Sequence, residues 1–442
     1  MAYNLVLAKY SSQHFHLIPE NEIYQTWAGN TTALKTSLYL FNLTNENDVL
    51  DGARPVFQEV GPFIYKKQVY RYDLSTFDGS PPKYLRYKAK TYYFQDYDYS
   101  LNDVFSGKVT TLDLFSAALA LKEENFLMKS YLVAAEPFVT RTPHEIIWGY
   151  SHDNIKSCYR FGFCPSDKIS VFSSENGTSE EKVVIKTGVE DINELGHVVE
   201  FNDKEILHVW ESEYANFING SEGAFMGQEL SVGSRRYIFA PGVCRSVVME
   251  ATKEVPHPNY PDLKVLLFEP ASEDQLDPRI YPPPEAFCKG QDYEPKCAPK
   301  GLIALSPCLA ASQHVPIYGS QGHLIDVHPD IRNQVKGMKQ PNEMEDRTNI
   351  LVDPITGITL GAHQVMQLSF YLDNTKKPSM MFRIVNEVNV DLDALRTIYR
   401  LVHGSRYWFH VTVYAFGGFC LMTFFIMMGA IIRMNRRSES SV

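Results

Sequence analysis

The sequence predicts an α+β protein: one large extramembrane domain, built mainly on an antiparallel sheet or barrel, followed by a C-terminal transmembrane helix. Three observations support this prediction. The 442 residues include 26 Tyr, 26 Phe, 25 Pro and 26 Gly, a composition that favours strands and turns over a helical bundle. Several segments alternate apolar and polar residues, as half-buried strands do. One stretch of 22 residues near the C-terminus contains no charge.

Composition also excludes several classes of protein. The chain is 44% hydrophobic and 21% charged, which is ordinary for a globular protein and argues against a disordered chain, a collagen or a coiled coil. The formal net charge is −10, from 42 Lys and Arg against 52 Asp and Glu, so no nucleic-acid partner is expected. We interpret the acidic excess as a solvated surface.

The expected strands fall in three regions. Residues 14–110 include TSLYLFNLT (36–44) and KTYYFQDY (90–97), and between them PVFQEVGPFIYKKQVYRYD, with a turn expected at Gly61-Pro62. Residues 145–270 supply KVVIKT, EILHVW, RRYIFAP and KVLLFEP, and residues 301–390 are again strand-rich. Residues 271–300 are rich in Pro and Cys and are expected to form a loop held by disulfides. One large ectodomain over residues 1–406 fits this pattern better than several small ones.

Two helices are expected between the first and second strand regions, at about residues 111–136. The first, TTLDLFSAALALKEEN, begins with a Thr cap and has a broad apolar face. The second, NFLMKSYLVAAE, ends before Pro137. They form either two core helices or an exposed helical cap.

The uncharged stretch is predicted to span a membrane. As a helix, residues 411–432 extend about 33 Å, enough for the ~30 Å hydrocarbon core. Aromatic residues precede it and basic residues follow it, and positive charge marks the cytoplasmic side; these flanking residues are Tyr407, Trp408, Phe409, Arg433, Arg436 and Arg437. We therefore expect a transmembrane segment at 407–432, a cytoplasmic tail at 433–442 and a translocated ectodomain. Because residues 1–18 resemble no signal peptide, we expect an additional membrane helix before them in the native protein.

Two features indicate a luminal or extracellular ectodomain. Four Asn-x-Ser/Thr sequons predict glycosylation sites at Asn30, Asn42, Asn176 and Asn219. Six of the seven cysteines precede the membrane segment, an even number that suits an oxidising compartment; they are Cys158, Cys164, Cys244, Cys288, Cys297 and Cys308. Composition alone leaves their pairing open. Cys420 lies within the membrane segment, where packing is the expected role.

No catalytic motif is recognisable. The sequence contains no Gly-x-Ser-x-Gly elbow, no His-Glu-x-x-His and no phosphate-binding glycine-rich loop. His314, His323 and His328 fit no standard metal spacing, so we expect neither a metal nor another cofactor. An unrecognised hydrolase is retained as a third and weakest alternative.

Five ordered motifs resemble the class B scavenger receptors, which include the fatty-acid translocase, the high-density-lipoprotein receptor and the lysosomal glucocerebrosidase receptor. VFQEVGPFIYKKQ (56–68) is similar to the family's EVGPYxYR, and VTRTPHEIIWGY (139–150) to its VxxTxxELLWGY. VWESEYANFINGSEG (209–223) and GVCRSV (242–247) resemble WES…INGTDG and CRS. EDRTNILVDPITGITL (345–360) resembles HxTxLDIxPxTG. The resemblance extends from about residue 20 to the membrane helix.

The resemblance implies an antiparallel β-barrel-like ectodomain with a membrane-distal helical cap, an internal lipid tunnel and two membrane helices. It also implies Cys244–Cys308 and Cys288–Cys297 disulfides. Cys158 and Cys164 match no family cysteine, but we expect them to pair, because free thiols are unfavoured in an oxidising compartment.

The resemblance implies a receptor, not an enzyme, that captures fatty acids, sterol esters, carotenoids or lipoproteins and passes lipid through the tunnel to the bilayer. The residues expected to contact ligand are in the second cap helix: Phe126, Leu127, Met128, Tyr131 and Leu132. Inward packing of these side chains is the alternative. The rival function is a protein-sorting receptor that binds a luminal partner through the cap. We expect the plasma membrane, with the lysosomal membrane as the alternative.

The chain ends in Ser440-Ser441-Val442, and a Ser two places before a C-terminal apolar residue fits a PDZ-domain ligand. The high-density-lipoprotein receptor is similar in ending with such a ligand. A short solvated tail without a partner is the alternative.

Overall fold

The structure is a computed structural model, and it describes residues 15–29, 33–95, 107–113, 116, 137–162, 164, 166–170, 172, 176–178, 180–272, 284–288, 298–308, 317–372 and 377–439. The chain forms two compact units. The larger comprises Ser12–Val255 and Val265–Asn389. The smaller includes Pro256–Lys264 and Val390–Val442.

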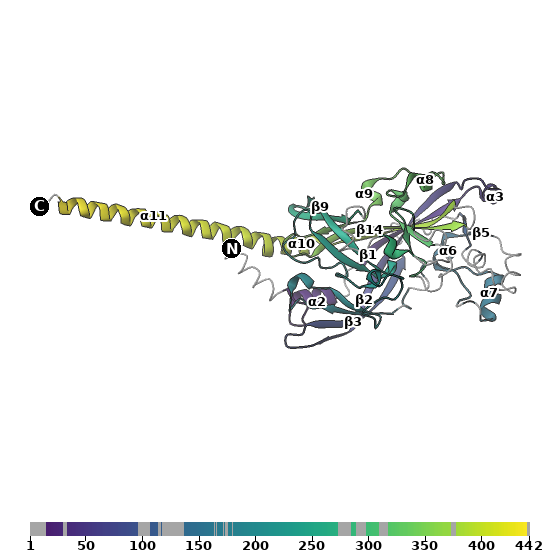
Figure 1. Ribbon diagram of the computed structural model, residues 1–442, viewed down its shortest axis with the longest axis horizontal. Helices are drawn as coiled ribbons and strands as arrows, with labels where there is room; N and C mark the ends of the chain where they lie inside the picture. The colour runs from purple at the N-terminus through teal and green to yellow at the C-terminus, as the bar shows by residue number, and fades with distance from the viewer. Residues whose placement is uncertain are drawn as a thin grey trace. The chain divides into compact units, whose positions relative to one another are not determined.

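A 13-stranded, mainly antiparallel sheet dominates the larger unit and curves into a nearly closed barrel (Figure 1). Its main path is β7-β6-β3-β2-β1-β15-β14-β13-β10-β9-β8, with β12 paired to β14 and β11 paired to β12. The strands are β1 (Ala33–Leu43), β2 (Phe57–Phe77), β3 (Tyr84–Gln95), β6 (Glu180–Lys186), β7 (Val198–Phe201), β8 (Arg235–Ala240), β9 (Arg245–His257), β10 (Tyr260–Pro270), β11 (Ile303–Ala304), β12 (Ile317–Ser320), β13 (Asn349–Val352), β14 (Thr359–Leu372) and β15 (Lys377–Asn389). The expected antiparallel barrel is thus confirmed.

The larger unit also contains short helices and a second small sheet. The small sheet pairs β4 (Val109–Leu112) with β5 (Phe138–Arg141). The α-helices of the larger unit are α2 (Glu22–Ala28), α3 (Glu46–Leu50), α6 (Pro143–Trp148), α7 (Asp153–Arg160), α8 (Pro329–Arg332) and α9 (Glu343–Asp346). Its 3-10 turns are η1 (Ile192–Glu194), η2 (Tyr214–Asn216), η3 (Pro241–Val243), η5 (Pro284–Phe287) and η7 (Gly322–Leu324).

One short segment closes the gap between the two edge strands β7 and β8. Ser221 forms an antiparallel bridge to His197, the residue before β7, and a parallel bridge to Ile238 of β8. The backbone N–H of Val198 donates to the carbonyl of Gly220 at 2.9 Å, and that of Phe239 donates to the carbonyl of Ser221 at 2.9 Å. Gly220–Ser221 therefore act as a clasp that satisfies edge groups which would otherwise lack partners.

The clasp requires glycine at position 220. Gly220 has a φ of +85°, in the left-handed region that favours glycine. A Cβ built there would lie 2.0 Å from the carbonyl oxygen of Tyr237, a backbone atom of β8. The clasp can therefore approach the edge strand only because this residue has no side chain.

The buried apolar side chains of the larger unit form three groups. The largest includes Phe41, Phe57, Phe63 and Phe370, each no more than 2% exposed. A second lies between α2, β3, β6 and β7 and includes Leu85 and Ile185. The third lies where β9, β10 and β13 meet, around Phe268 and other buried side chains. The strand alternation predicted from the sequence directs these residues inward.

The expected turn at Gly61-Pro62 is wrong, because β2 continues through both residues. The peptide between them is cis. A Cβ at Gly61 would lie 2.8 Å from the carbonyl oxygen of Leu38 on β1, and the β1–β2 register shifts between Leu38 and Leu40. The glycine therefore permits a bulge with close strand contact and does not mark a chain reversal.

Two further expectations need correction. EILHVW (205–210) forms no strand; only Ile206 makes an isolated bridge, to Phe217. Thr111 is not the cap of the first expected helix, because Thr111 and Leu112 belong to β4 and pair with Val139 and Phe138. Pairing across the small sheet outweighs the Thr capping signal there. Most of the expected cap, 114–115 and 117–136, lies outside the described residues.

The smaller unit contains α10 (Leu392–Ile398), a π-helical turn η8 (Tyr399–Gly404) and the long helix α11 (Ser405–Glu439). The ring of Tyr399 stacks on His403 with centroids 5.9 Å apart, and it meets Tyr260, the first residue of β10, edge to face at 5.4 Å. These aromatic contacts brace the turn from which α11 begins.

Helix α11 carries the predicted membrane span. His410–Gly429 is long and apolar enough to cross a bilayer, and none of it is buried in the protein. Tyr407 and Trp408, just before it, are 64% and 66% exposed, as expected of interfacial aromatics. The helix has 35 residues, about 52 Å, so it extends beyond a ~30 Å hydrocarbon core. It continues through Arg433, Arg436 and Arg437, where the sequence suggested only a short tail.

The clasp gives the first testable prediction. Replacing Gly220 by Ala should lower the free energy of unfolding by more than about 3 kcal/mol, because the new Cβ must displace the carbonyl of Tyr237. Gly233→Ala is the matched control: Gly233 has a similar φ, +89°, but no atom lies within 4 Å of its Cβ position. Denaturant unfolding of both purified full-length variants measures the difference. An equal fall in the free energy of unfolding for both variants would show that the close contact between Gly220 and Tyr237 does not make position 220 more sensitive to a side chain.

Candidate functional site

The residues expected to contact ligand, Phe126, Leu127, Met128, Tyr131 and Leu132, all lie outside the described residues. The structure does describe Asp113, which directly precedes that segment in the chain. Asp113, the residue after β4, is buried with 3% exposure. Its carboxylate accepts hydrogen bonds from the backbone N–H of Ser116 at 3.2 Å and from the Ser116 hydroxyl at 2.6 Å. This is the arrangement of a helix N-cap, so Asp113 performs the capping role that the sequence suggested for Thr111.

Tyr150 and His152, which follow α6 in the chain, also contact the Asp113 carboxylate. The Tyr150 hydroxyl donates to Oδ1 of Asp113 at 2.9 Å, and Nε2 of His152 lies 3.4 Å from Oδ2. Burial alone would raise the pKa of Asp113, but hydrogen bonds from His152, Ser116 and Tyr150 outweigh it and lower the pKa below its usual value. A charged Asp113 therefore joins β4 to the start of α7.

Helix α6 follows from its sequence, VTRTPHEIIWGY. The Thr142 side chain accepts from the backbone N–H of Glu145, and the Glu145 carboxylate accepts from the backbone N–H of Thr142, which is a complete capping box. Pro143 occupies the first turn, where its missing N–H costs nothing. At the far end, Trp148 meets the ring of Tyr65 from β2 at 5.4 Å, edge to face.

Aromatic rings fill the space beneath α6. Phe172 stacks on Tyr93 of β3 with centroids 4.3 Å apart and planes at 10°, and it lies 6.0 Å from both Tyr65 and Trp148. Edge-to-face and offset aromatic pairs of this kind stabilise by ~0.5–1.5 kcal/mol beyond the area they bury. Two of the five recognised motifs therefore meet here, through Tyr65 and Trp148, and fix the platform that carries α6 and α7.

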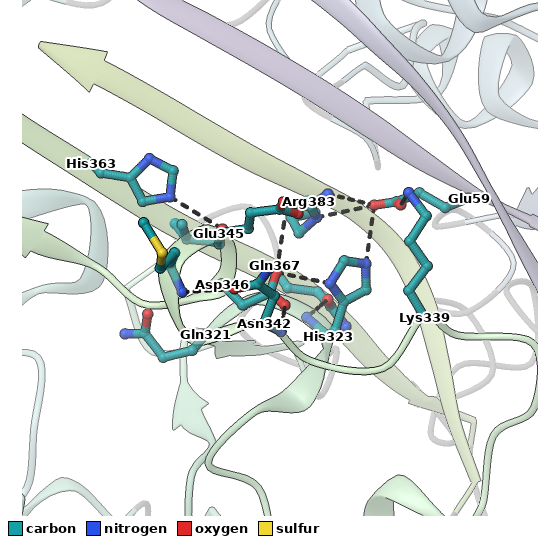
Figure 2. A network of polar contacts seen from close by, with 12 residues as sticks. Glu59, Gln321, His323, Lys339, Asn342, Glu345, Asp346, His363, Gln367 and Arg383 are labelled. Atoms are coloured by element: carbon teal, nitrogen blue, oxygen red, sulfur yellow. Dashed lines mark hydrogen bonds and ion pairs between the residues drawn. The ribbon is translucent and has the colours of Figure 1, made fainter.

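A second cluster, the buried ion network, joins two strands of the sheet to residues of η7 and α9 (Figure 2). Glu59 of β2 and Arg383 of β15 reach across β1, which lies between their strands. Nη2 and Nε of Arg383 donate to Oε1 of Glu59 at 2.7 and 3.0 Å, and both side chains are 5% exposed. The guanidinium also covers the ring of Tyr39 on β1, 4.1 Å from its centroid.

His323 connects this pair to Asp346. Its Nδ1 lies 2.8 Å from Oδ1 of Asp346 and its Nε2 lies 3.3 Å from Oε1 of Glu59. The His323 backbone N–H donates to Oε1 of Gln367 at 2.8 Å, which helps to hold His323 at its left-handed φ of 45°. At the rim, Nζ of Lys339 lies 2.6 Å from Oε2 of Glu59 and is largely exposed.

Close packing fixes where Asp346 sits. A Cβ at Gly322 would lie 2.3 Å from Oδ1 of Asp346, so a larger residue at 322 would displace the carboxylate. The other oxygen, Oδ2, accepts from the backbone N–H of Asn342 at 2.8 Å and so helps to cap α9. The network thus ties η7 and α9 to β2 and β15.

The charges shift one another's pKa. Burial opposes the charged form of Glu59, but hydrogen bonds from His323 and Lys339 and the charge of Arg383 prevail and lower its pKa from 4.5 to about 2. Burial alone would lower the pKa of His323, but hydrogen bonds to Asp346 and Glu59 outweigh burial and raise it. The pKa of Asp346 is lowered because the hydrogen bond from His323 outweighs burial.

The clasp segment supplies a third polar cluster around Glu222. The Trp27 indole donates to Oε1 of Glu222 at 2.6 Å and the Tyr87 hydroxyl to Oε2 at 2.5 Å. Nη2 of Arg71 lies 3.4 Å from Oε1, and its guanidinium covers the Trp27 ring at 4.6 Å. These contacts attach α2 to β2 and β3 and hold the end of the clasp.

The cysteines form the expected disulfides where both partners are described. Cys244 is bonded to Cys308, and Cys158 to Cys164. Cys288 is also disulfide-bonded, and its expected partner, Cys297, lies outside the described residues.

Arg245, next to the Cys244–Cys308 bond, lies between two aromatic rings. Its guanidinium is 4.1 Å from the centroid of Phe287 and 4.9 Å from that of Trp210. The indole of Trp210 in turn donates to the carbonyl of Cys244 at 2.7 Å. The CRS and WES motifs therefore form one structural unit around this disulfide.

Three sequons are described, and the fourth, Asn30, is not. Asn42 accepts a hydrogen bond from the backbone of Thr110, and Asn176 accepts one from the backbone of Tyr93. Both bonds engage the side-chain carbonyl oxygen and not the amide nitrogen that would carry a glycan. They are compatible with glycosylation, which stays a prediction for all four sites, Asn219 included.

The histidines singled out for a metal have other roles where they are described. His323 belongs to the buried ion network, and His328 accepts from the backbone N–H of Asp330 at the start of α8. His314 lies outside the described residues. Within the part of the chain that the structure describes, no group of three or more His, Cys, Asp or Glu side chains is placed to hold a metal ion.

A chain that combines a barrel-like domain with an apolar helix long enough to cross a bilayer has the elements of a membrane-anchored receptor. The chain belongs to the CD36 family, whose model matches residues 1–431. It is 24% identical over 371 residues to scavenger receptor class B member 1 of Sus scrofa, an alignment that covers 81% of this chain and 69% of the relative. It is 26% identical over 360 residues to lysosome membrane protein 2 of Homo sapiens, covering 79% and 72%. The resemblance seen in the motifs is thereby confirmed.

The five motifs place their polar and aromatic residues in clusters that hold the barrel. Sequence reasoning recognised the motifs but not the partners, because those partners are far apart in the chain. Glu59 and Arg383, for example, are 324 residues apart. An acidic residue within an apolar strand was the only local signal that a buried cation would be needed.

The buried ion network gives the second prediction, which concerns pH. Because the pKa of His323 is raised, the stability it contributes is fully present below about pH 6.5 and is lost as pH rises through its folded pKa. Because the pKa of Glu59 is lowered, its contribution is present above about pH 4.5 and is lost as pH falls towards 2. The network should therefore stabilise the protein most between these limits.

The test replaces His323 by Gln in the full chain. At pH 5.5 the free energy of unfolding should fall by about 2 kcal/mol, because Asp346 loses a buried hydrogen-bond partner. The variant should also lose less stability than the wild type between pH 6 and pH 8. His328→Gln, at an exposed histidine outside the network, is the control. If its pH profile matches that of His323→Gln, the network does not set the pH dependence.

Proposed function

We propose that this protein is a membrane receptor that captures hydrophobic ligands through the segment at about 111–136 and passes them along an internal tunnel to the bilayer. The observation that carries the proposal is the CD36-family match over residues 1–431, which includes both the ectodomain and the apolar helix. Relatives named scavenger receptor class B member 1 support it. Fatty acids, sterol esters, carotenoids and lipoproteins are the ligand classes that fit.

The mechanism requires no bond to be made or broken. Transfer of each CH₂ group from water to an apolar site is favourable by ~0.8 kcal/mol, so about ten buried groups already correspond to micromolar affinity. A rigid barrel suits this task because its wall does not have to fold around each ligand. Asp113, held by Tyr150 and His152, fixes the chain just before the proposed capture segment.

The rival proposal is a protein-sorting receptor that binds a luminal protein through the same segment. VTRTPHEIIWGY favoured it at the sequence level, and lysosome membrane protein 2 is a relative. Sequence identity does not distinguish the two proposals, because this chain is 24% identical to a scavenger receptor class B member 1 and 26% identical to a lysosome membrane protein 2. Plasma-membrane or lysosomal residence, and a second membrane helix, belong to the same set of proposals.

Leu132→Glu provides the third prediction. If ligand enters over the second expected cap helix, the charge should reduce uptake of a labelled sterol ester severalfold at matched surface abundance, because a carboxylate is unfavourable in an apolar site. Leu50→Glu is the control, since Leu50 on α3 is already 59% exposed. Normal uptake by Leu132→Glu, with loss of a luminal protein in pull-downs from the same cells, would favour the sorting receptor instead.

The tail provides the fourth prediction. A peptide of residues 433–442 should bind PDZ domains, with its carboxylate held by backbone amides and Val442 in the pocket. Phosphorylation of Ser440 should weaken binding. It adds about −1.5 to −2 charge to the side chain whose free hydroxyl the PDZ domain has to bind. The measurement is an array of PDZ domains, with a peptide lacking Val442 as control. Equal retention of the two peptides would show that the terminus is not recognised.

A further inference from the structure

The sequon at Asn176 is hydrogen-bonded to β3. The side-chain oxygen of Asn176 accepts from the backbone N–H of Tyr93 at 3.0 Å. The next residue, Gly177, donates its backbone N–H to the carbonyl of Thr91 at 2.8 Å. The backbone N–H of Asn176 donates to the carbonyl of the buried Phe172 at 3.0 Å. These bonds hold the Asn176 amide in one orientation, and they therefore set the direction in which a glycan on its Nδ2 leaves the protein.

Aromatic rings occupy the outward face of β3 at this point. Successive side chains of a strand point to opposite faces, and Tyr93 is buried, where it stacks on Phe172. Tyr92 and Phe94 therefore point outward, and Phe94 is 47% exposed. Their rings lie 20° from parallel with centroids 6.4 Å apart, and Tyr70 of β2 meets Tyr92 edge to face at 5.3 Å. Tyr70, Tyr92 and Phe94 are named here the outer rings.

The rest of this face of β3 is charged. Arg86, Lys88 and Lys90 alternate with buried residues along the strand, so they share the outward face with Tyr92 and Phe94. Charged side chains remain in water, and the outer rings are thus an aromatic patch on a solvated surface. A patch of this kind usually marks a binding surface or favours association with other molecules.

The sequon lies directly against the outer rings. A Cβ at Gly177 would lie 2.6 Å from Cε1 of Tyr92, and the φ of Gly177 is +71°, so only glycine allows the chain to approach the ring this closely. Asn176 is the adjacent residue, and a sugar on its Nδ2 therefore begins beside Tyr92. One face of an N-acetylglucosamine ring presents C–H groups with partial positive charge, which pack favourably on the negative face of an aromatic ring.

We propose that the outer rings are a binding site for the protein's own glycan: the first N-acetylglucosamine on Asn176 packs on Tyr92 and Phe94. Covalent attachment keeps the sugar at a high effective concentration beside the rings, so a contact too weak to hold a free sugar is still populated. The glycan covers an aromatic patch that would otherwise favour association, and it braces the end of β3. The inference goes beyond the proposed function and does not depend on which ligand the receptor captures.

The experiment uses the full chain, purified from a secretory eukaryotic host that attaches high-mannose glycans. Mass spectrometry of the peptide around Asn176 measures glycan occupancy. It also measures the rate at which an endoglycosidase cleaves between the first two sugars in the native protein. Tyr92→Ser and Phe94→Ser should each speed this cleavage about two- to tenfold, the range that corresponds to one aromatic contact. Phe94→Ser is the safer variant for folding, because it removes a ring that is already half exposed.

Two controls separate contact with the outer rings from a general change in the protein. Phe77→Ser removes an exposed ring at the opposite end of the β2–β3 hairpin, where Phe77 pairs with Tyr84, and it should not change cleavage at Asn176. The second control is the glycan at Asn42. The side-chain oxygen of Asn42 is also held by a backbone N–H, but the cross-strand partner of Asn42 on β2 is Gln58 and not an aromatic residue. The ring variants should not change cleavage there.

A thermal-unfolding cycle tests whether the contact also stabilises the fold. Thr178→Ala abolishes the sequon and leaves the bond between Asn176 and Tyr93 in place. It should lower the Tm of the wild type by about 2 °C and should not lower that of Tyr92→Ser further, because the second protein has already lost the contact. Thr178→Ser keeps the sequon and should lower the Tm much less.

Three outcomes would overturn the proposal. The first is an Asn176 that carries no glycan in the purified protein. The second is cleavage at Asn176 that the ring variants leave unchanged, or that Phe77→Ser speeds equally. The third is a fall in Tm on Thr178→Ala that is the same with and without the Tyr92 ring, because such a fall would come from Thr178 itself or from a glycan that does not contact the rings.

Discussion

The ion pair between Glu59 and Arg383 is the contact on which the arrangement of the larger unit depends. It spans β1 and is completed by His323 and Asp346, so strands from the two ends of the chain are linked to helices that follow β12. Removing one partner of a buried pair typically costs about 3–5 kcal/mol, because the other charge is left uncompensated. Apolar packing makes the barrel favourable, but this network helps to select one arrangement of its strands.

The sequence predicted the strands better than the connections between them. Alternation identified β1 and the core of β2, because each strand has one buried face. The Gly61-Pro62 pair was misread, because the local pattern of a turn and that of a bulge are the same, and only the close approach of Leu38 distinguishes them. Thr111 was misread for a similar reason: its capping signal is local, whereas its partner in β5 is distant in the chain.

The candidate site shows the same division. The motifs that reveal the family are rich in Glu, Asp, Arg, Trp and Tyr, residue types that would elsewhere suggest binding or chemistry. Here Glu59, Glu222 and Arg245 each bind another part of the same chain. Recognition of the family therefore informs the scaffold more than the ligand.

The clasp at Gly220–Ser221 affects how neighbouring molecules of this protein can associate in a membrane. Proteins anchored by a helix are confined to two dimensions, where neighbours collide often and in similar orientations. An open sheet edge under such confinement would invite strand addition between neighbouring molecules, and from there the growth of fibrillar assemblies. Because the clasp occupies the edges of β7 and β8, receptors can crowd together at high surface density and still part as separate molecules.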